Sequence, residues 1–191
     1  MTSDGTLLQR NPLYASAAVM FSAAAMLWWL GRVWWCQAGD YRPWSFAVFS
    51  EHNSQHIIDP YSFTHVLHGV AEFWLIGLVF RFVPLHWRLV IALAIEGSWE
   101  VVENTDYVIN RYREATISLN YYGDSILNSL SDILCCGLGF LIAYKLRFWK
   151  SLALFLSTEV VLIAWIRDSL LLNIVMLIYP LDAIKHWQSG M

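Results

Sequence analysis

The sequence predicts an all-α integral membrane protein, a helical bundle of about five transmembrane helices in a single domain, residues 1–191. Of the 191 residues, 58% are hydrophobic and only 14% are charged, whereas soluble domains average about 25% charged residues. One crossing of a bilayer needs roughly 20 residues, so this length suits four to six helices. The net charge of −3 and the scattered basic residues argue against nucleic acid as a partner. Cys36, Cys135 and Cys136 show no metal-binding spacing and are expected to be small apolar residues within helices.

The first apolar run, residues 13–35, is predicted to be a retained transmembrane helix. It has some features of a signal peptide, but no small-x-small cleavage site follows it. A polar segment, residues 37–63, comes next and is expected to form a long loop. Its residues His52, His56 and Asp59 are expected to be solvated.

Four further apolar segments follow, and each is predicted to cross the membrane. The second span, 64–83, ends at Pro84, which cannot continue a helix. The third and fourth spans cover residues 87–106 and 124–145, and the fifth covers 151–167. All of them are close to the roughly 20 residues that one crossing needs.

Two regions outside these spans have a different character. The Tyr- and Arg-rich stretch 107–123 is predicted to be a connection, and Gly123 marks a break just before the next helix. Its residues Arg111 and Arg113 fit either interfacial anchors or a phosphate-binding lid over the site. Residues 169–181 are too short to cross the bilayer independently, so they are expected to extend the fifth helix or to lie in the membrane interface.

The positive-inside rule gives the orientation of the bundle. If the N-terminus is inside, the inner side holds basic residues and almost no acids, namely Arg10, Arg81, Arg88, Lys145, Arg147 and Lys150. The outer side has as many basic residues, but they are interleaved with acidic ones. The short, acid-free loops 81–88 and 145–150 therefore favour an inside N-terminus and an outside C-terminus.

The predicted spans also carry polar residues that do not suit lipid, and these residues recur with helical spacing. Stripes lie on the second, third and fourth spans: His65, His68 and Glu72; Glu96, Glu100 and Glu103; Asp124, Asn128 and Asp132. Because successive spans run in opposite directions, all three stripes lie at the same membrane face. A charged residue at the centre of a membrane helix costs roughly 2.5–3.5 kcal/mol, so the stripes are expected to face one another. They predict a polar pocket in the outer half of the bundle.

Carboxylates packed together repel, so such a pocket needs shared protons, an arginine, a metal ion or a cationic ligand. Histidines and carboxylates on facing helices are plausible ligands for a divalent metal ion. The predicted metal ligands are His65, His68, Glu100 and Glu103. Their spacing matches neither the Glu-x-x-His of di-iron proteins nor HExxH. Without a metal, an aspartate and a glutamate could instead form an acid–base pair with separated pKa values.

The residues predicted to carry catalysis are Glu100, Glu103 and Asp132, and those predicted to support binding are Glu96, Asp124, Asn128 and Arg113. Structural roles compete with these functional ones. The histidines could bond to carbonyl groups or water, the glutamates could form a hydrogen-bond network, and Asn128 could join helices. Asp124 stands where an N-cap residue is expected. Asp132 lies two turns deeper, where capping cannot apply.

Three motifs, HVLHG, WEVVENT and YYGDSILNSLSDI, occur in this order. In them the sequence resembles a family of small bacterial multipass inner-membrane proteins. The resemblance covers almost the whole chain and implies a location in the cell inner membrane, but it brings no established activity. A more distant similarity, to VanZ-like membrane proteins, is carried by three pairs: His65 with Gly69, Glu100 with Glu103, and Asn128 with Asp132. The related pattern often has an acid at the position of Asn128, which disfavours a two-metal site here.

Two functions are consistent with these residues. The first is a metal-dependent hydrolase or transferase that acts on a lipid or envelope precursor reaching the pocket from the outer leaflet. The second is a non-catalytic protein that binds a lipid or another membrane protein, with a polar core that sets the helix register. A transporter is less well supported, because the polar residues stop halfway across the bundle. In either case the N-terminus is expected to be cytoplasmic and the C-terminus periplasmic.

Overall fold

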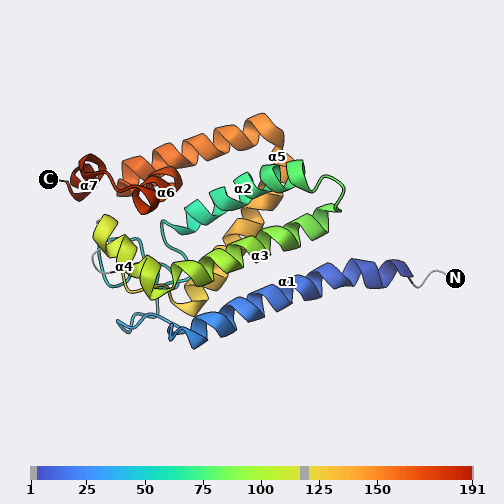
Figure 1. Cartoon of the computed structure of the whole chain (residues 1–191), viewed down its shortest axis with the longest axis horizontal. Helices are drawn as coiled ribbons and strands as arrows, with labels where there is room; N and C mark the ends of the chain where they lie inside the picture. Colours follow the sequence, from blue (N-terminus) through green and yellow to red (C-terminus); the bar gives the residue numbers. More distant parts are fainter. Residues whose placement is uncertain (1–3, 117–120, 191) are drawn as a thin grey trace.

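The computed structural model describes residues 4–116 and 121–190 and has an all-α fold (Figure 1). Its helices are α1 (Asp4–Trp29), α2 (Ser62–Val79), α3 (Leu85–Glu103), α4 (Asp106–Ala115), α5 (Ile126–Ile166), α6 (Leu170–Ile178) and α7 (Asp182–Ser189). Within the described ranges no β-strand is present. The predicted all-α class is therefore confirmed.

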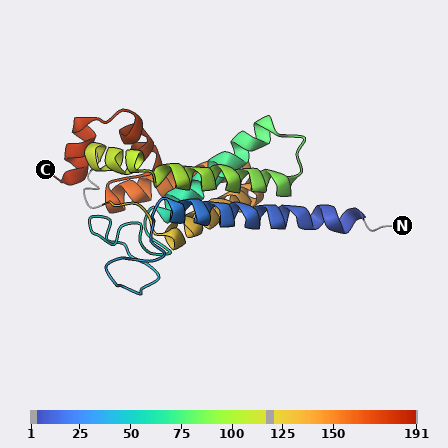
Figure 2. The same cartoon turned by 60° about the horizontal axis from the view of Figure 1, so that its bottom comes forward.

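The long helices form the bundle and the short helices gather at one of its ends. Helices α1, α2 and α3 run roughly along the long axis, and α5 packs against all three (Figure 1). Helices α4, α6 and α7 lie at the end opposite the N-terminus, together with the long loop between α1 and α2 (Figure 2). This end therefore brings several segments, distant in sequence, over the polar ends of the long helices.

Helix α5 is bent into two arms at Arg147, whose φ of 62° and ψ of 175° are not helical. The second arm turns back toward the end that holds the short helices (Figure 1). The arms, residues 126–146 and 148–166, overlap the segments 124–145 and 151–167 that were predicted to be the fourth and fifth spans. The basic stretch 145–150, predicted to be a loop between these spans, lies at the bend.

The contact between α2 and α5 is close because glycines line it. A Cβ atom on Gly69 would lie 1.8 Å from the carbonyl oxygen of Cys136, and one on Gly139 would lie 1.9 Å from that of Val66. Helix backbones approach so closely only where small residues face the partner helix. The contact thus fixes the distance between the polar side chains that the two helices carry.

Among the described residues, three helical segments are long and apolar enough to cross a membrane: Asn11–Trp29, Ser62–Val79 and Ile126–Ile166. Many of their large apolar side chains are exposed, among them Phe21, Leu75, Leu78, Leu134, Leu138, Val160 and Val161. So large an apolar surface is rare in water and suits contact with lipid. Helix α3 is not one of the three, because it carries four charged residues. Its crossing at 87–106 stays a prediction.

The first helix ends earlier than predicted. Helix α1 stops at Trp29 rather than residue 35, because Gly31 takes a left-handed conformation with φ at 81°. As a result Cys36 lies in the loop after α1. The expectation that this cysteine belongs to a helix is wrong.

The stretch 107–123, expected to be a connection, contains helix α4. Val108, Ile109, Tyr112 and Ala115 are buried there, at positions that share one face of a helix. Packing of this face stabilises α4 although its sequence is polar on average. Residues 117–120 of the stretch lie outside the described residues.

The C-terminal segment 169–181 forms a separate helix, so the alternative that it extends α5 is wrong. Arg167 adopts a left-handed conformation, with φ at 55° and ψ at 27°, and ends α5. Ser169 then begins α6, because its hydroxyl accepts a hydrogen bond from the backbone amide of Leu172 at 3.3 Å. Helix α6 has nine residues, only about 14 Å of helix. Its place in the membrane interface stays a prediction.

Candidate functional site

Helices α2, α3 and α5 bring a histidine and three carboxylates together in the bundle. Nδ1 of His65 on α2 contacts Glu96 of α3 and lies 3.4 Å from Oε1 of Glu100. Its other ring nitrogen, Nε2, lies 3.8 Å from Oδ2 of Asp132 on α5. The two glutamates are almost completely buried, each with 1% of its surface exposed. The polar stripes of the three helices therefore face one another.

Glu96 orients two histidine rings. It contacts Nδ1 of His65, and both of its carboxylate oxygens lie 3.0 Å from Nδ1 of His68. A carboxylate only accepts hydrogen bonds, so Nδ1 carries the proton in each neutral ring. Nε2 of both rings then keeps a lone pair, as in the carboxylate–histidine pairs that orient metal ligands.

Glu100 and Asp132 carry buried oxygen atoms that have no hydrogen-bond partner within the described part of the chain. Among the described residues, neither carboxylate oxygen of Glu100 makes a hydrogen bond, and Oδ1 of Asp132 makes none either. All three atoms are buried. Burying an ionised group without compensation costs several kcal/mol, so these oxygens require a proton or a cation.

Within the described residues, two sets of side chains with metal-ligand geometry contain His65, and a third joins Glu96 to Glu72 and Cys136. Ligand atoms of His65, His68 and Glu96 lie within 4.8 Å of one another, and so do those of His65, Glu100 and Glu103. In the first set Glu96 is already engaged by both rings. The second set contains the unpartnered oxygens of Glu100, so it is the better metal site. Imidazole and carboxylate ligands suit Zn²⁺, Fe²⁺ or Mn²⁺.

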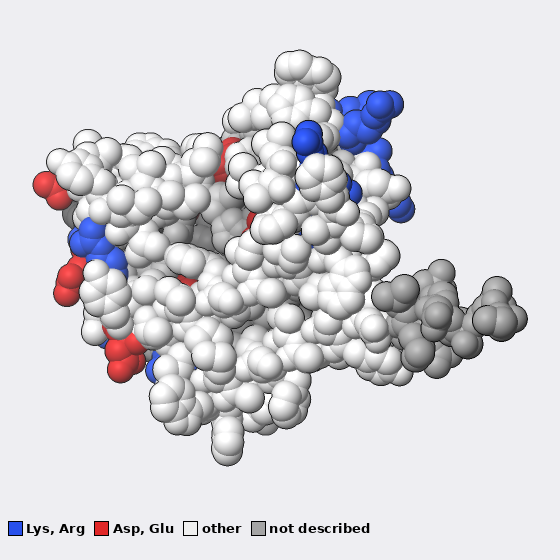
Figure 3. Space-filling view, turned by 45° about the vertical axis from the view of Figure 1, so that its right-hand side comes forward, with Lys and Arg blue, Asp and Glu red and all other residues white. Residues whose placement is uncertain are grey.

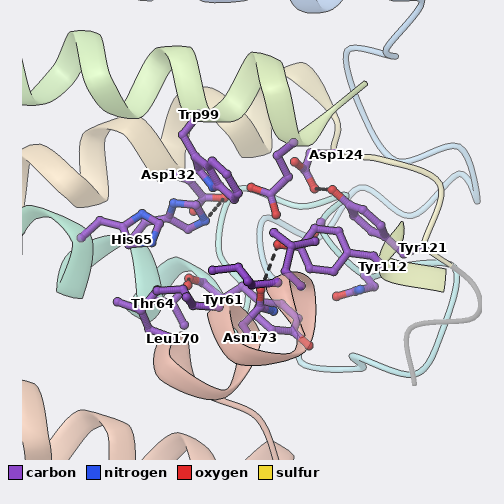
Figure 4. Close-up of a pocket in the computed structure, with 17 residues that line it drawn as sticks. Tyr61, Thr64, His65, Trp99, Tyr112, Tyr121, Asp124, Asp132, Leu170 and Asn173 are labelled. Carbon is purple, nitrogen blue, oxygen red and sulfur yellow. Dashed lines mark hydrogen bonds and ion pairs between the residues drawn. The ribbon is translucent and has the colours of Figure 1, made fainter. Parts of the chain in front are cut away.

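The cluster opens into a cavity of about 230 Å³ (Figure 4). Its polar wall is formed by His65, His68, Glu103, Asp124 and Asp132. Its aromatic wall is formed by Tyr61, Trp99, Tyr112 and Tyr121. Helix α6 faces these groups with Leu170, Asn173, Ile174, Leu177 and Ile178. The cavity is therefore lined by polar groups from the long helices and mainly by apolar side chains along α6.

Hydrogen bonds from two elements hold α6 in this wall. Glu159, on the second arm of α5, accepts hydrogen bonds from the backbone amides of Leu170 at 3.0 Å and Leu171 at 3.2 Å. Its negative charge thus lies at the positive end of the helix dipole. From α4, the hydroxyl of Tyr112 donates to Oδ1 of Asn173 at 2.9 Å.

Asp124 also lines the cavity. Asn104 donates from Nδ2 to Asp124 Oδ2 at 2.6 Å and accepts from the Asp124 backbone amide at 2.7 Å, and Tyr121 donates to Oδ1 at 3.0 Å. The expectation that Asp124 caps α5 is wrong, because its carboxylate is engaged by these two residues. Ser125 is the cap, and its hydroxyl accepts from the backbone amide of Asn128 at 3.2 Å.

The long loop packs onto the start of α5. Asn128 donates from Nδ2 to the backbone carbonyl of His56 at 2.7 Å, and the Ser125 amide donates to the carbonyl of Ser54 at 3.0 Å. His56 and Asp59 are consequently buried, with 0% and 2% exposed, so their expected solvation is wrong. Burial raises the pKa of Asp59 to about 6. Through this hydrogen bond Asn128 holds the loop in place beside the cavity wall.

The two arginines of α4 are not among the described residues that line the cavity. Arg111 donates from Nε to the carbonyl oxygen of Leu177 at 3.0 Å and so joins α4 to α6. The guanidinium carbon of Arg113 lies 5.0 Å from the centre of the Tyr122 ring, a cation–π contact. Arg113 therefore does not join the other predicted site residues in the cavity wall.

Several residues complete the site without having been predicted, namely Trp99, Asn104, Tyr112, Tyr121 and Asn173. A signal for Tyr112 existed in the sequence, because positions 108, 109, 112 and 115 have the apolar spacing of an amphipathic helix. The two asparagines gave no signal, since each acts through a contact distant in sequence.

Comparison with known proteins identifies the family. Residues 27–190, which include the whole cluster and cavity, match the family described as Protein of unknown function (DUF2585). The chain belongs to the DUF2585 family. It is 44% identical over 180 residues to a UPF0314 protein of Paracoccus denitrificans, a match that covers 94% of this chain and 93% of the relative. The predicted membership of a bacterial family without an established activity is therefore confirmed.

Other relatives of this DUF2585 chain match over similar lengths. A UPF0314 protein of Rhizobium meliloti is 47% identical over 161 residues, covering 84% of this chain and 82% of the relative. One from Sphingopyxis alaskensis is 40% identical over 183 residues, covering 96% and 97%. No solved structure matches the chain significantly. The similarity to VanZ-like proteins stays a prediction.

Proposed function

We propose that this protein is a metal-dependent hydrolase or transferase that acts on a lipid or envelope precursor in the bacterial inner membrane. One observation carries the proposal. The carboxylate of Glu100 is buried without a hydrogen bond among the described residues, and ligand atoms of His65 and Glu103 lie within 4.8 Å of it. A divalent cation bound by these three side chains would compensate the buried charge.

The neighbouring residues have complementary roles in this proposal. Glu96 holds Nδ1 of His65 and of His68 and leaves Nε2 of each ring available. The metal ion, when bound, would lower the pKa of a coordinated water molecule and so supply a nucleophile at neutral pH. Asp132, with Oδ2 at 3.8 Å from Nε2 of His65, is placed to accept the proton of that water.

The shape of the cavity supports an amphipathic substrate. Its volume of about 230 Å³ is below the roughly 300–1,000 Å³ of sites that enclose a drug-sized ligand. It therefore accommodates the reacting head group and not a whole lipid. Leu170, Ile174 and Leu177 of α6 form an apolar wall of the same cavity, which suits the first part of an acyl or prenyl chain.

The distribution of charge supports the proposed orientation. Figure 3 shows a cluster of Lys and Arg at one end of the molecule and a mixture of basic and acidic residues at the other. The α2–α3 loop and the bend of α5 lie at the same end as the N-terminus (Figure 1). By the positive-inside rule this end is cytoplasmic. The cavity and the C-terminus then belong to the periplasmic side.

Turnover of extracted lipids by the purified chain tests the proposal. Full-length protein, prepared without chelator and reconstituted in nanodiscs, is incubated with divalent metal and a total extract of membrane lipids and lipid-linked precursors. Products are identified by mass spectrometry. The wild type is compared with Glu100→Gln and Asp132→Asn, and with Glu72→Gln as a matched control. Glu72 is a carboxylate of α2 that accepts a hydrogen bond from the Cys136 thiol at 3.3 Å. It lies near Glu96, but it does not line the cavity and is not one of the proposed metal ligands.

The wild type and Glu72→Gln are expected to form product, whereas Glu100→Gln and Asp132→Asn should be slower by about 100-fold or more. Circular dichroism and size-exclusion chromatography establish that each variant is folded. Equal rates in all four proteins, or no product from the metal-loaded wild type, would contradict the proposal.

The lining of the cavity favours a second candidate, a protein that binds a lipid without turnover. Aromatic side chains such as Trp99 and Tyr121, and the apolar face of α6, would hold a lipid whether or not a metal ion is bound. Native mass spectrometry separates the two functions. A lipid that co-purifies equally with wild type and Glu100→Gln, without any product, supports binding alone.

A further inference from the structure

A second cluster of metal-ligating side chains lies in the loop between α1 and α2, outside the cavity. It consists of Cys36, His52 and His56, with one ligand atom of each lying within 4.8 Å of the others. Sγ of Cys36 lies 3.4 Å from Nδ1 of His52, and Nε2 of His56 lies 3.3 Å from the same nitrogen. Cys36 and His56 are buried.

The protonation state of His56 follows from its surroundings. Its Nδ1 lies 2.6 Å from the backbone carbonyl oxygen of Arg42. A carbonyl only accepts, so Nδ1 carries the proton and Nε2 of the neutral ring presents a lone pair toward His52. The rings of Trp35 and His56 make an edge-to-face contact at a centroid distance of 5.8 Å. A backbone carbonyl that holds one ring nitrogen is a common device for aiming the other at a metal ion.

A hydrogen bond between the two rings does not involve the thiol of Cys36. Nδ1 of His52 has either one proton or one lone pair, yet it faces both the sulfur of Cys36 and the lone pair of His56. If it donates to His56, the thiol has no acceptor there. If it accepts from the thiol, two nitrogen lone pairs face each other. A cation would be bound by all three atoms at once.

The distances between the ligand atoms fit zinc. Tetrahedral Zn²⁺, with Zn–N of about 2.0–2.1 Å and Zn–S of about 2.3 Å, places neighbouring ligand atoms about 3.3–3.6 Å apart. The two separations that involve His52 are 3.3 Å and 3.4 Å. We infer that Cys36, His52 and His56 form a zinc site whose fourth position is open to water. A thiolate with two imidazoles selects a borderline-soft ion such as Zn²⁺ over Mg²⁺ or Ca²⁺.

Zinc at this position clamps the loop that borders the cavity. It joins Cys36, just after α1, to the segment 52–56, and Asn53 and Ser54 of this segment line the cavity. Asn128 of α5 holds the same segment through the carbonyl of His56. The site is independent of the proposed function, because it uses other ligands and a sulfur atom.

X-ray absorption at the zinc edge of the full-length wild type tests the inference without any variant. One sulfur neighbour at about 2.3 Å with imidazole scattering is the expected result. A zinc spectrum with only oxygen and nitrogen neighbours would overturn the inference, even if zinc were bound in the cavity. Metal bound by His65, Glu100 and Glu103 gives no sulfur neighbour, so the two proposals fail separately.

Cobalt substitution assigns the sulfur to one cysteine. Thiolate-bound Co²⁺ gives a charge-transfer absorption, which should appear in the wild type and in the control variants Cys135→Ser and Cys136→Ser. Cys36→Ser should lose this absorption and about one zinc ion per chain. A His65→Ala/Glu100→Gln variant should keep it. Absorption that disappears with Cys136→Ser instead, or is missing from folded wild type, would refute the site.

Discussion

Gly69→Ala tests the close contact between α2 and α5 that sets the geometry of the histidine–carboxylate cluster. The added Cβ atom would lie 1.8 Å from the carbonyl oxygen of Cys136 and 2.7 Å from its carbonyl carbon, whereas ordinary contact begins at 3.4 Å. Both are backbone atoms, so no side-chain rotation makes room. The helices must therefore move apart by more than an ångström, and His65 moves away from Asp132.

The effect on stability follows from two opposing terms. Overpacking costs about 1–3 kcal/mol, while alanine gains up to about 1 kcal/mol over glycine inside a helix. A net loss of about 1–2 kcal/mol corresponds to a fall in melting temperature of about 2–8 °C for a chain of this size. The contact between His65 Nε2 and Asp132, already 3.8 Å long, lengthens as well. Metal affinity in the cluster should fall by about tenfold or more.

Melting in detergent, followed by tryptophan fluorescence, and metal titration by calorimetry measure both effects. Gly77→Ala is the matched control on the same helix, because its Cβ would meet only the end of the Arg88 side chain at 3.4 Å. This control should melt at or above the wild-type temperature. If Gly69→Ala keeps the wild-type melting temperature and metal affinity, the close helix contact does not control the site.

Three further outcomes are expected. Burial raises the pKa of Asp168 from 3.8 to about 6, so its contribution to stability is present below about pH 4 and is lost as pH rises through 6. The melting temperature should therefore fall between about pH 4 and 6, and less steeply in Asp168→Asn; identical slopes would argue against a titrating Asp168. Glu159→Leu removes the acceptor for two α6 amides and should speed hydrogen exchange across residues 170–178, whereas unchanged exchange would show that packing alone holds α6. Tyr112→Phe loses the bond to Asn173 and should lower the unfolding free energy by about 0.5–1.5 kcal/mol in denaturant titrations.

The sequence was sufficient to predict that helices α2, α3 and α5 carry facing polar stripes. The spacing of His65 and His68, and of Glu96 and Glu100, places each pair on one face of a helix. The alternation of span directions then puts these faces at one end of the bundle. Local periodicity and chain direction are both readable from the sequence, so the core of the cluster could be predicted.

The remaining parts of the site depend on contacts between residues distant in the sequence. Asn128 binds the carbonyl of His56, 72 positions away, and Tyr112 binds Asn173, 61 positions away. Nothing in the local pattern of a polar loop or a short apolar helix indicates such partners. The loop was therefore expected to be solvated. The role of α6 as a cavity wall was missed for the same reason.

Metal analysis in a Cys36→Ser background tests the central claim most directly, because it removes the sulfur ligand of the loop site. Protein purified without chelator is analysed by plasma mass spectrometry, alone and with the added substitution Glu100→Gln. The histidine–glutamate cluster should retain about one divalent metal ion per chain in Cys36→Ser and lose it when Glu100 is also replaced. Folded Cys36→Ser that contains no metal, and whose melting temperature does not rise when divalent metal is added, would contradict a metal centre at His65, Glu100 and Glu103.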